Sequence, residues 1–423
     1  MWQSRNQTGR MLAAVDFAPP GSARVVGMPV SRGRVAERAA AGEAASGLRP
    51  VLGPLSEPPP ALAEAWDRLA TGAAEVNVFA ERWFVMAAVH HLESEGDPHL
   101  LQIWEGEGVD ARLIALLPLV ISRHYGRLPV RHVTNWRHYQ SFLGTPLIAA
   151  GRERDAWRAM LDALGRTRWA RNFLHVEGLV ENGPVHRGLI AAGHPCETVH
   201  RIERAMLASR LSPEAYYEQA VRKKKRKELK RLSARLEELG EVRVQRLASP
   251  EELAPWTDAF LALERAGWKG RDGAALANTP QTEAFFREAV AGAHAAGRLE
   301  MLRLDCDGRP IAMLVNFLAA PGSFSFKIAF DEDYARFSPG VLIQIENYRI
   351  LERPEIAWMD SCAVQDHPMI NSLWTERRAI VRVTTPLGAG RGAGLFHVCR
   401  AAERAAALLR RLRAAPKDRV HDA

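Results

Sequence analysis

The sequence has few cysteines, no long apolar run and no leader-like start, and each absence excludes a class of protein. The longest apolar run, residues 113–121, is interrupted by Pro118 and is far shorter than the ~20 residues that span a bilayer. No apolar segment typical of a signal peptide precedes residue 60, so we expect a cytoplasmic protein. The cysteines suit a reducing compartment and have no metal-ligand spacing, so no metal is expected; they are Cys196, Cys306, Cys362 and Cys399.

Length and composition set the outer bounds of the fold. A chain of 423 residues is long for one core, and 47% hydrophobic residues with 25% charged residues are typical of a globular protein. Residues 1–60 contain scattered Ala, Gly, Pro and Arg without periodicity, which predicts a disordered tail. Residues 222–231 hold eight basic residues and one acidic residue, a net charge of seven, against a formal +8 for the whole chain.

A strand, a turn and a helix start follow one another directly within residues 324–350. Apolar and small or polar residues alternate over residues 324–330, which predicts a strand with one apolar face. Ser338 stands where an N-cap would, Pro339 suits the first helical position, and Gly340 leaves room for a ligand to approach the backbone. A helix start presents free N–H groups and can hold an anion, although Ser-Pro-Gly can equally well only begin a helix.

The elements around this junction give it a context. Strands are predicted at residues 299–304 and 311–318 before it, and a short strand at residues 356–359 after it. That short strand ends at Asp360, and a further helix is predicted from His367.

This order of elements resembles the coenzyme A-binding half of the GNAT acyltransferase superfamily. The closest branch is that of bacterial cellulose-biosynthesis-type (CelD-like) acetyltransferase domain proteins, which are related to the Fem-type aminoacyl transferases. Five segments carry the resemblance: RKKKRKELKRLSARLEELG at 222–240, ALERAGWKG at 262–270, DGRPIAMLVNF at 307–317, KIAFDEDYARFSPGVL at 327–342, and DSCAVQDHPMINSLWTERR at 360–378. The usual glycine-rich loop is absent at the turn.

The resemblance implies an α/β (α+β) fold with two GNAT-like domains, each a mixed central sheet flanked by helices. The N-terminal domain, residues 61–205, would be degenerate and bind no coenzyme. Its predicted elements are helices at 77–92, 153–164 and 186–192 and strands at 99–104, 113–121 and 172–177. The acyl-CoA-binding domain would cover residues 206–395, and residues 396–423 would form a C-terminal helix and tail. The histidines and aromatics of residues 131–142 either line the acceptor cleft or form a loop packed on the surface.

The activity that the resemblance implies is acyl-CoA-dependent N-acyl transfer by direct attack of an amine, with a general base. His367 is the first candidate base because histidine titrates near neutral pH, and Asp360 would orient it or act alone. Glu264 is the second candidate. Each of these residues also has a plain structural interpretation. A nucleophilic Cys362 beside His367 is formally possible, but a buried structural cysteine is the simpler interpretation.

The same resemblance places the coenzyme and the acceptor along residues 268–341. Residues expected to contact acyl-CoA are Lys327, Arg336, Phe337, Ser338, Gly340 and Val341. Residues expected to contact the acceptor are Trp268, Lys269 and Tyr334. The acceptor is expected to be an amino group on an envelope sugar, lipid or polysaccharide precursor. The alternatives are transfer from aminoacyl-tRNA, as in Fem-type proteins, and a non-catalytic scaffold at a membrane surface.

The basic run from Arg222 to Arg231 lies on a predicted amphipathic helix closed by Gly240. Its charges either form a solvated face or bind an anionic partner: membrane lipid, coenzyme phosphates or nucleic acid. No aromatic residues interleave with the charges, which disfavours nucleic acid. Peripheral contact with the inner face of a membrane is therefore one expectation.

Overall fold

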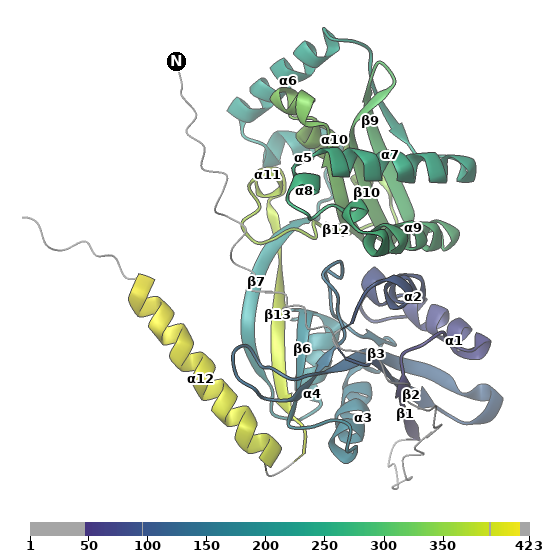
Figure 1. The fold of residues 1–423 in the computed structure, drawn as a ribbon, viewed down its shortest axis with the longest axis vertical. Helices are drawn as coiled ribbons and strands as arrows, with labels where there is room; N and C mark the ends of the chain where they lie inside the picture. The colour runs from purple at the N-terminus through teal and green to yellow at the C-terminus, as the bar shows by residue number, and fades with distance from the viewer. Residues whose placement is uncertain (1–46, 95, 389–390, 415–423) are drawn as a thin grey trace, which may run out of the picture. The chain divides into compact units, whose positions relative to one another are not determined.

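The computed structural model describes residues 47–94, 96–388 and 391–414, and its centre is a mixed sheet of thirteen strands with helices on its faces (Figure 1). The strand order is β1-β2-β3-β4-β6-β13-β7-β12-β11-β10-β9-β8, with β5 paired to β3. The predicted α/β fold with a mixed sheet and flanking helices is confirmed.

Three strands of the N-terminal half, β2, β3 and β6, were predicted from the sequence, whereas β1, β4 and β5 were not. Its strands are β1 Leu48–Pro54, β2 His99–Glu105, β3 Arg112–Ser122, β4 His132–Asn135, β5 Leu147–Ile148 and β6 Phe173–Val180. Its helices are α1 Pro60–Thr71, η1 Val78–Ala80, α2 Arg82–His91, η2 Gly108–Asp110, α3 Glu153–Arg166 and α4 Pro184–Ala191. Because β1 pairs with β2 along its whole length, the predicted disordered tail is wrong for residues 48–60, and residues 1–46 lie outside the described residues.

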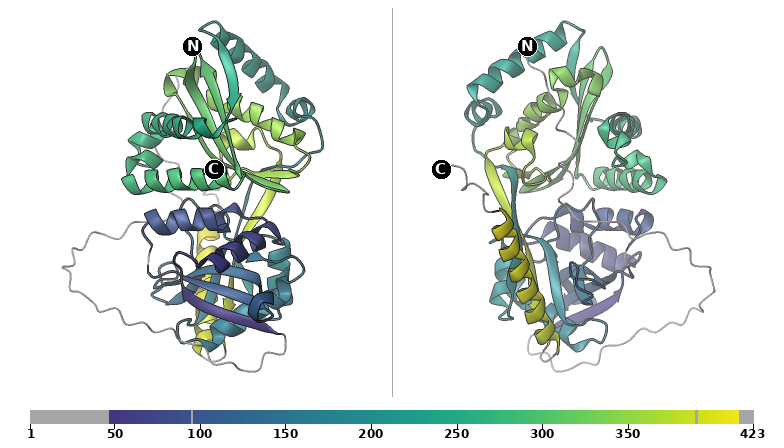
Figure 2. Two further views of the ribbon diagram at one scale, coloured as in Figure 1. Left: turned by 90° about the vertical axis from the view of Figure 1, so that its right-hand side faces the viewer. Right: turned by 60° about the vertical axis from the view of Figure 1, so that its left-hand side comes forward.

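The C-terminal half places helices on both faces of its strands (Figure 2). The strands are β8 Val242–Arg246, β9 Leu299–Cys306, β10 Arg309–Ala319, β11 Gly322–Phe330 and β12 Trp358–Asp360. One face is covered by α7 Leu253–Ala266 and α9 Pro280–Ala295, and the other by α6 Lys223–Glu237 and α10 Pro339–Glu346. The shorter elements are α5 Pro213–Ala220, η3 Pro250–Glu252, α8 Trp268–Arg271, η4 Leu276–Asn278, η5 Glu332–Phe337, η6 Asn347–Glu352 and α11 Pro368–Asn371.

Two long strands, β7 Glu197–Leu207 and β13 Glu376–Pro386, connect the halves. β13 inserts between β6 and β7, and β7 reaches β12 through residues 206 and 207. The boundary expected between residues 205 and 206 therefore falls inside β7. The predicted helix from His367 is wrong beyond residue 371, because only α11 is helical and β13 begins at Glu376. The last helix, α12 Arg391–Ala414, packs Phe396 and Cys399 beside Tyr125 and Phe173.

A β-bulge interrupts β11 in the middle of the predicted alternation. In the β10–β11 register, Asn316 pairs with Ser325 and Val315 pairs with Lys327, so Phe326 is an extra residue without a partner. After the bulge the side chains exchange faces: Ile328 packs in the cluster that contains α10, and Lys327 lies on the opposite face. The prediction of one apolar face over residues 324–330 is therefore wrong beyond Phe326.

Candidate functional site

The site lies where β11 and β12 separate. These parallel strands pair from Gly322↔Trp358 to Phe324↔Asp360, and β12 ends there while β11 continues for six residues. Beyond Phe324 this edge of β11 has no strand partner. Lys269 reaches it from α8, and its Nζ donates to the carbonyl oxygen of Ile328 at 2.7 Å. An unpaired strand edge presents backbone donors and acceptors that an amide-bearing chain can bind.

The bulge at Phe326 turns Lys327 towards this opening. The Lys327 ammonium lies 5.7 Å from the ring centre of Phe142 and 5.5 Å from that of Phe326, and it makes no hydrogen bond or ion pair within the described part of the chain. Burial, and then the charge of Lys269, lower the pKa of Lys327 to about 8, while Glu264 acts in the opposite direction. The side chain can therefore exchange a proton near neutral pH, as an acid–base group must.

Glu264 is held by two donors beside the same opening. Its side chain is 2% exposed; Oε1 accepts from Lys269 Nζ at 2.9 Å and Oε2 from the N–H of Leu276 at 2.8 Å. This arrangement positions Lys269 and connects α7 to η4. The role of Glu264 as a base stays a prediction, as does the acceptor contact of Lys269.

Asp360, at the end of β12, is fully buried between two arginines. Its carboxylate oxygens lie 2.9 Å from Arg204 Nη2 and 3.0 Å from Arg378 Nη1, and Oδ1 also accepts from the N–H of Cys362 at 2.9 Å. Burial opposes its ionisation, but the two arginines outweigh burial and hold the pKa of Asp360 below its usual value. Because Arg204 comes from β7 and Arg378 from β13, this cluster connects three strands at the meeting of the two halves.

His367 follows β12 and caps α11. Its Nδ1 accepts from the N–H of Ile370 at 3.4 Å, so the neutral ring carries its proton on Nε2, which can donate a hydrogen bond. Burial, and to a smaller degree the charge of Lys269, lower the pKa of His367, so its ring is neutral at pH 7. Burial also raises the pKa of Cys362 well above its usual value, so its thiol stays protonated, which argues against a cysteine nucleophile.

The turn before α10 differs from its predicted geometry. Ser338 has φ 56° and ψ 49°, in the left-handed region, and its side chain makes no cap hydrogen bond, so its assignment as an extended N-cap is wrong. Pro339 has no N–H, and the N–H groups of Val341 and Leu342 both donate to the Ser338 carbonyl. In the first turn, only the N–H of Gly340 is left for a ligand.

Gly340 serves packing in this turn. A Cβ on Gly340 would lie 3.3 Å from Phe330 Cδ1, so the absent side chain lets α10 approach β11 closely. Arg336 is exposed and its guanidinium lies 4.7 Å from the ring centre of Phe337, which packs near Tyr334. These contacts neither establish nor exclude the predicted coenzyme contacts of residues 336–341.

The structure gathers only part of the predicted set around the opening. Side chains near the ends of β11 and β12 are Lys327, Lys269, Glu264, Asp360 and His367. Trp268 is 39% exposed, and its N–H donates to Glu332. Phe142 ends the stretch at residues 131–142 that was expected either to line the acceptor cleft or to form a loop packed on the surface. Arg204 and Arg378 were not predicted.

That stretch forms a loop packed between the halves. His138 stacks on Phe84 and contacts Phe285, and Phe142 contacts Phe79 and Phe326. Burial, and then Arg137, lower the pKa of His138 to about 3, so the ring is neutral in the folded protein. Phe142 forms one wall beside Lys327, so this end of the loop belongs to the site.

The N-terminal half has a matching parallel junction, which its own chain closes. β4 pairs with β6 only at Val133↔Leu174 and Thr134↔His175. Beyond that, Asn135 donates to the Glu177 carbonyl at 2.9 Å and to the Gly144 carbonyl at 3.0 Å, and its side-chain oxygen accepts from the Glu177 N–H at 2.9 Å.

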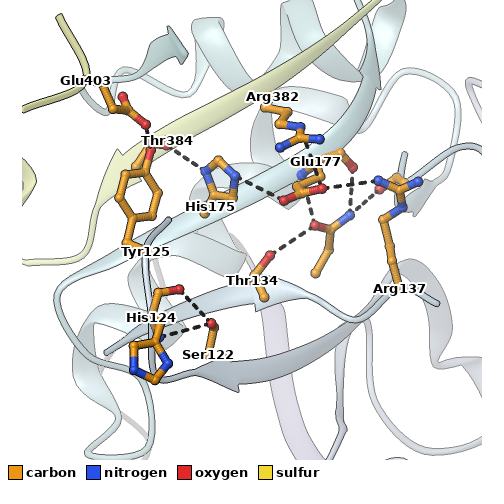
Figure 3. A network of polar contacts seen from close by, with 12 residues as sticks. Ser122, His124, Tyr125, Thr134, Arg137, His175, Glu177, Arg382, Thr384 and Glu403 are labelled. Atoms are coloured by element: carbon orange, nitrogen blue, oxygen red, sulfur yellow. Dashed lines mark hydrogen bonds and ion pairs between the residues drawn. The ribbon is translucent and has the colours of Figure 1, made fainter. Parts of the chain in front are cut away.

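Glu177 also connects the charged residues around this junction. Figure 3 shows its side chain between Arg137, Arg382 and His175. Burial raises the pKa of Glu177, but His175 and the two arginines outweigh it and bring the value to about 2. The charges of this junction are thus matched by groups of the same chain.

A pocket of about 450 Å³ lies beside η5, at the end of β11. Its wall includes Leu263, Gly267, Arg271, Arg309, Asp331 and Asp333. Within residues 47–94, 96–388 and 391–414, no cluster of three or more His, Cys, Asp or Glu is placed to hold a metal. Over the same ranges, every helix is too short or too polar to cross a membrane.

Comparison with known proteins locates a family signature in the C-terminal half. Residues 223–363 match the model of the acetyltransferase (GNAT) domain, and this range includes β11, β12 and their opening. No curated protein is significantly similar to the chain.

Three solved structures are similar to this chain at low sequence identity. FemX is 10% identical, with a TM-score of 0.50 over 79% of this chain and 98% of FemX. A tandem GNAT protein from the clavulanic acid biosynthesis pathway is 15% identical, with a TM-score of 0.39 over 81% and 100% of the two chains. The C-terminal domain of a putative lysylphosphatidylglycerol synthetase from Agrobacterium fabrum is 11% identical, with a TM-score of 0.45 over 80% and 95%.

Proposed function

We propose that this chain, whose residues 223–363 match the GNAT acetyltransferase domain, is an acyl-CoA-dependent N-acyltransferase. The observation that carries the proposal is the open edge of β11 beyond Phe324, with a bulge at Phe326 and the Lys327 ammonium beside it. A GNAT match alone supports acyl transfer, and the open edge supports a donor bound along β11.

The amide-bearing arm of acyl-CoA fits the residues at the opening. Such an arm can take the place of a paired strand along β11, where Lys269 already donates to the Ile328 carbonyl. The phosphates would lie at residues 336–341, where Arg336 is exposed and the Gly340 N–H is free. Bound acyl-CoA supplies an activated thioester as the acyl donor.

The chain's own residues would orient the acceptor and move its proton. The neutral His367 ring carries its proton on Nε2, so His367 would act as the base only after Nδ1 released the Ile370 N–H and took the proton there. Lys327 Nζ can hold or release a proton near neutral pH. Asp360 would hold Arg204, which donates to the Phe142 carbonyl at 2.8 Å and so fixes the wall opposite Lys327.

The acceptor in this proposal is an amino group on an envelope sugar, lipid or polysaccharide precursor, reached from the cytoplasm. Its support is the resemblance of residues 222–378 to cellulose-biosynthesis-type proteins. Trp268, Lys269 and Tyr334 stay the predicted acceptor contacts.

Isothermal titration calorimetry of the full chain with coenzyme A and acetyl-CoA tests the donor. We expect saturable binding with a stoichiometry of one, which Ser338→Asp abolishes by placing an anion against the phosphates. Ser338→Asn is the matched neutral control and should bind as the wild type does. Equal affinity of the Asp and Asn variants for coenzyme A would show that the phosphates bind away from this turn.

The absence of any saturable binding would overturn the donor assignment. Filter binding with charged tRNA then separates the remaining alternatives. Binding would support aminoacyl-tRNA as the donor, and its absence would support a non-catalytic scaffold.

A further inference from the structure

Helix α6 presents a charged outer face whose use the proposed activity does not explain. Its inner side is fixed by Leu229, which belongs to the same core cluster as Tyr216 and Ile370, and by Leu236, which belongs to the same cluster as Phe337. Both leucines are buried, so the rotation of the helix about its axis is determined by the core. The basic residues that lie away from this buried stripe therefore face outward.

Two of these basic residues have structural partners. Lys225 bonds the Ser372 hydroxyl, and Arg226 donates to the carbonyls of Glu218 and Val221 at the end of α5. These contacts attach α6 to its neighbours. They explain two of the eight basic residues in the run.

Four lysines on the outer face have no partner of their own. Across the described parts of the chain, none of them makes a hydrogen bond or an ion pair, and all four are exposed: Lys223, Lys224, Lys227 and Lys230. The one acidic residue of the run, Glu228, is already paired with Arg231. Like charges one helical turn apart repel one another, so these lysines lower the stability of the folded protein when no partner is bound. A bound polyanion would remove this repulsion.

We propose that the outer face of α6, defined by Lys223, Lys224, Lys227 and Lys230, docks the protein onto an anionic lipid surface. Ammonium groups in rows along a rigid helix suit a plane of headgroups, and each basic residue near such a surface strengthens binding about fivefold. The proposal does not depend on the donor or on the reaction.

The size and composition of the face favour lipid over the other anions. Helix α6 has 15 residues and is roughly 22 Å long. A single coenzyme has three phosphate groups, too few to match charges spread over that length. Stacking aromatic residues, which single-stranded nucleic acid would use, are absent from α6. Leu239, just beyond the helix, is 48% exposed and offers an apolar contact of the kind a lipid interface accepts.

Co-sedimentation of the full chain with vesicles tests the proposal. Vesicles of phosphatidylcholine alone are compared with vesicles containing 30% phosphatidylglycerol, at low and at physiological salt. We expect binding only to the anionic vesicles, weaker at higher salt. Combining Lys223→Gln, Lys224→Gln, Lys227→Gln and Lys230→Gln should reduce the partition coefficient at least tenfold.

A charge-matched variant controls for net charge. It combines substitutions of four exposed arginines of the N-terminal half to Gln: Arg112, Arg123, Arg127 and Arg158. This variant should bind anionic vesicles as the wild type does, and thermal melts should show both variants folded. An equal loss in the two variants, or undiminished binding by the lysine variant, would overturn the proposal.

Two parallel measurements exclude the other partners. The lysine variant should bind acetyl-CoA with the affinity of the wild type, and neither protein should bind tRNA at physiological salt. A lysine variant that lost coenzyme or tRNA binding but kept its vesicle binding would reassign α6 to that ligand. Failure of acetyl-CoA to bind the wild type would affect only the proposed activity.

Discussion

Each half of the sheet contains one pair of parallel strands, β4 with β6 and β11 with β12. The two halves differ in whether side chains of the protein bridge the gap beyond the pair. In the N-terminal half, Asn135 bridges the gap to Glu177 and Gly144, and the Gly144 N–H donates to the Gly178 carbonyl at 2.9 Å. In the C-terminal half, the edge of β11 beyond Phe324 is bound by the Lys269 side chain, which donates to the Ile328 carbonyl.

This difference explains why one half is suited to bind a donor and the other is not. A strand edge satisfied by its own chain offers a ligand nothing, because every added hydrogen bond would replace an existing one. An open edge beside an unpaired ammonium can form new hydrogen bonds and charge contacts with a ligand. The comparison thus supports the proposal that the N-terminal half is degenerate and binds no coenzyme, and it can be tested by altering each junction in turn.

The largest effect is expected at the end of the open pair. Asp360→Asn removes the charge that pairs with buried Arg204 and with Arg378, and leaves both uncompensated, which should lower the free energy of unfolding by about 3–5 kcal/mol. Because the Asp360 pKa is depressed, its stabilising effect is present above the unfolded pKa and is lost as pH falls through the folded pKa. Urea unfolding at pH 7 and at a series of pH values below the unfolded pKa measures both.

Glu203→Gln is the control for Asp360, because the Arg201–Glu203 pair lies on the surface and contributes little. An Asp360→Asn protein of unchanged stability but strongly reduced turnover would instead identify Asp360 as an acid–base residue.

Lys327→Met should separate function from stability. Replacing a half-buried, unpaired ammonium with an apolar side chain should leave the stability at pH 7 unchanged or raise it by about 1–2 kcal/mol. Turnover should fall by about 100-fold if Lys327 moves a proton or orients the donor. Paired urea unfolding and steady-state assays measure the two effects.

The pH dependence gives a second readout for Lys327. The pKa of Lys327 in the folded protein, about 8, lies below its pKa in the unfolded chain. The wild type therefore loses stability as the pH falls from the unfolded pKa to about 8, and the Lys327→Met variant should lack this pH dependence. Reduced stability in Lys327→Met, with normal turnover, would make Lys327 a structural residue.

Asn135→Ala tests the closed junction. It leaves the Glu177 backbone and the Gly144 carbonyl without their partner, and should cost roughly 2 kcal/mol in urea unfolding. Calorimetry should still find one coenzyme site, because the loop at residues 136–146 remains between the halves. A second saturable site in this variant would show that closure alone kept the N-terminal half from binding.

Much of the sheet could be predicted because its signals are local. The strands at residues 99–105, 112–122 and 299–306 and the helix α3 follow from the period of their own apolar residues. The insertion of β13 between β6 and β7 could not be predicted, because it pairs residues about 200 positions apart. Helical spacing of Ile370 and Trp374 concealed the turn that ends α11 before that strand.

The site was predictable only in its local parts. Glu264 and Lys269 are five residues apart and could be proposed as neighbours from sequence alone. Arg204 meets Asp360 across 156 positions, and the bulge at Phe326 depends on how β10 pairs with β11, so neither left a local pattern. The sequence therefore indicated which residue types within 268–341 could serve a site. Which of them lie together in the fold depends on pairing between distant strands.

The smallest predicted effect compares two Ser-Pro steps at helix starts. Ser212 is extended, at φ −61°, and its side chain accepts from the Ala215 N–H at 3.2 Å, whereas Ser338 is left-handed and caps nothing. Ser212→Gly should therefore lower the free energy of unfolding by a few tenths of a kcal/mol, about the usual cost of replacing a cap by glycine.

Ser338→Gly should raise the free energy of unfolding by about 0.5–1 kcal/mol, because glycine adopts the left-handed region without the steric cost that serine carries. The same series of urea unfolding curves measures both glycine variants. Opposite signs at the two Ser-Pro steps would establish that Ser338 begins α10 in a strained left-handed conformation without capping the helix. Matching losses would restore Ser338 as a helix cap, and with it the helix start as a ready anion site.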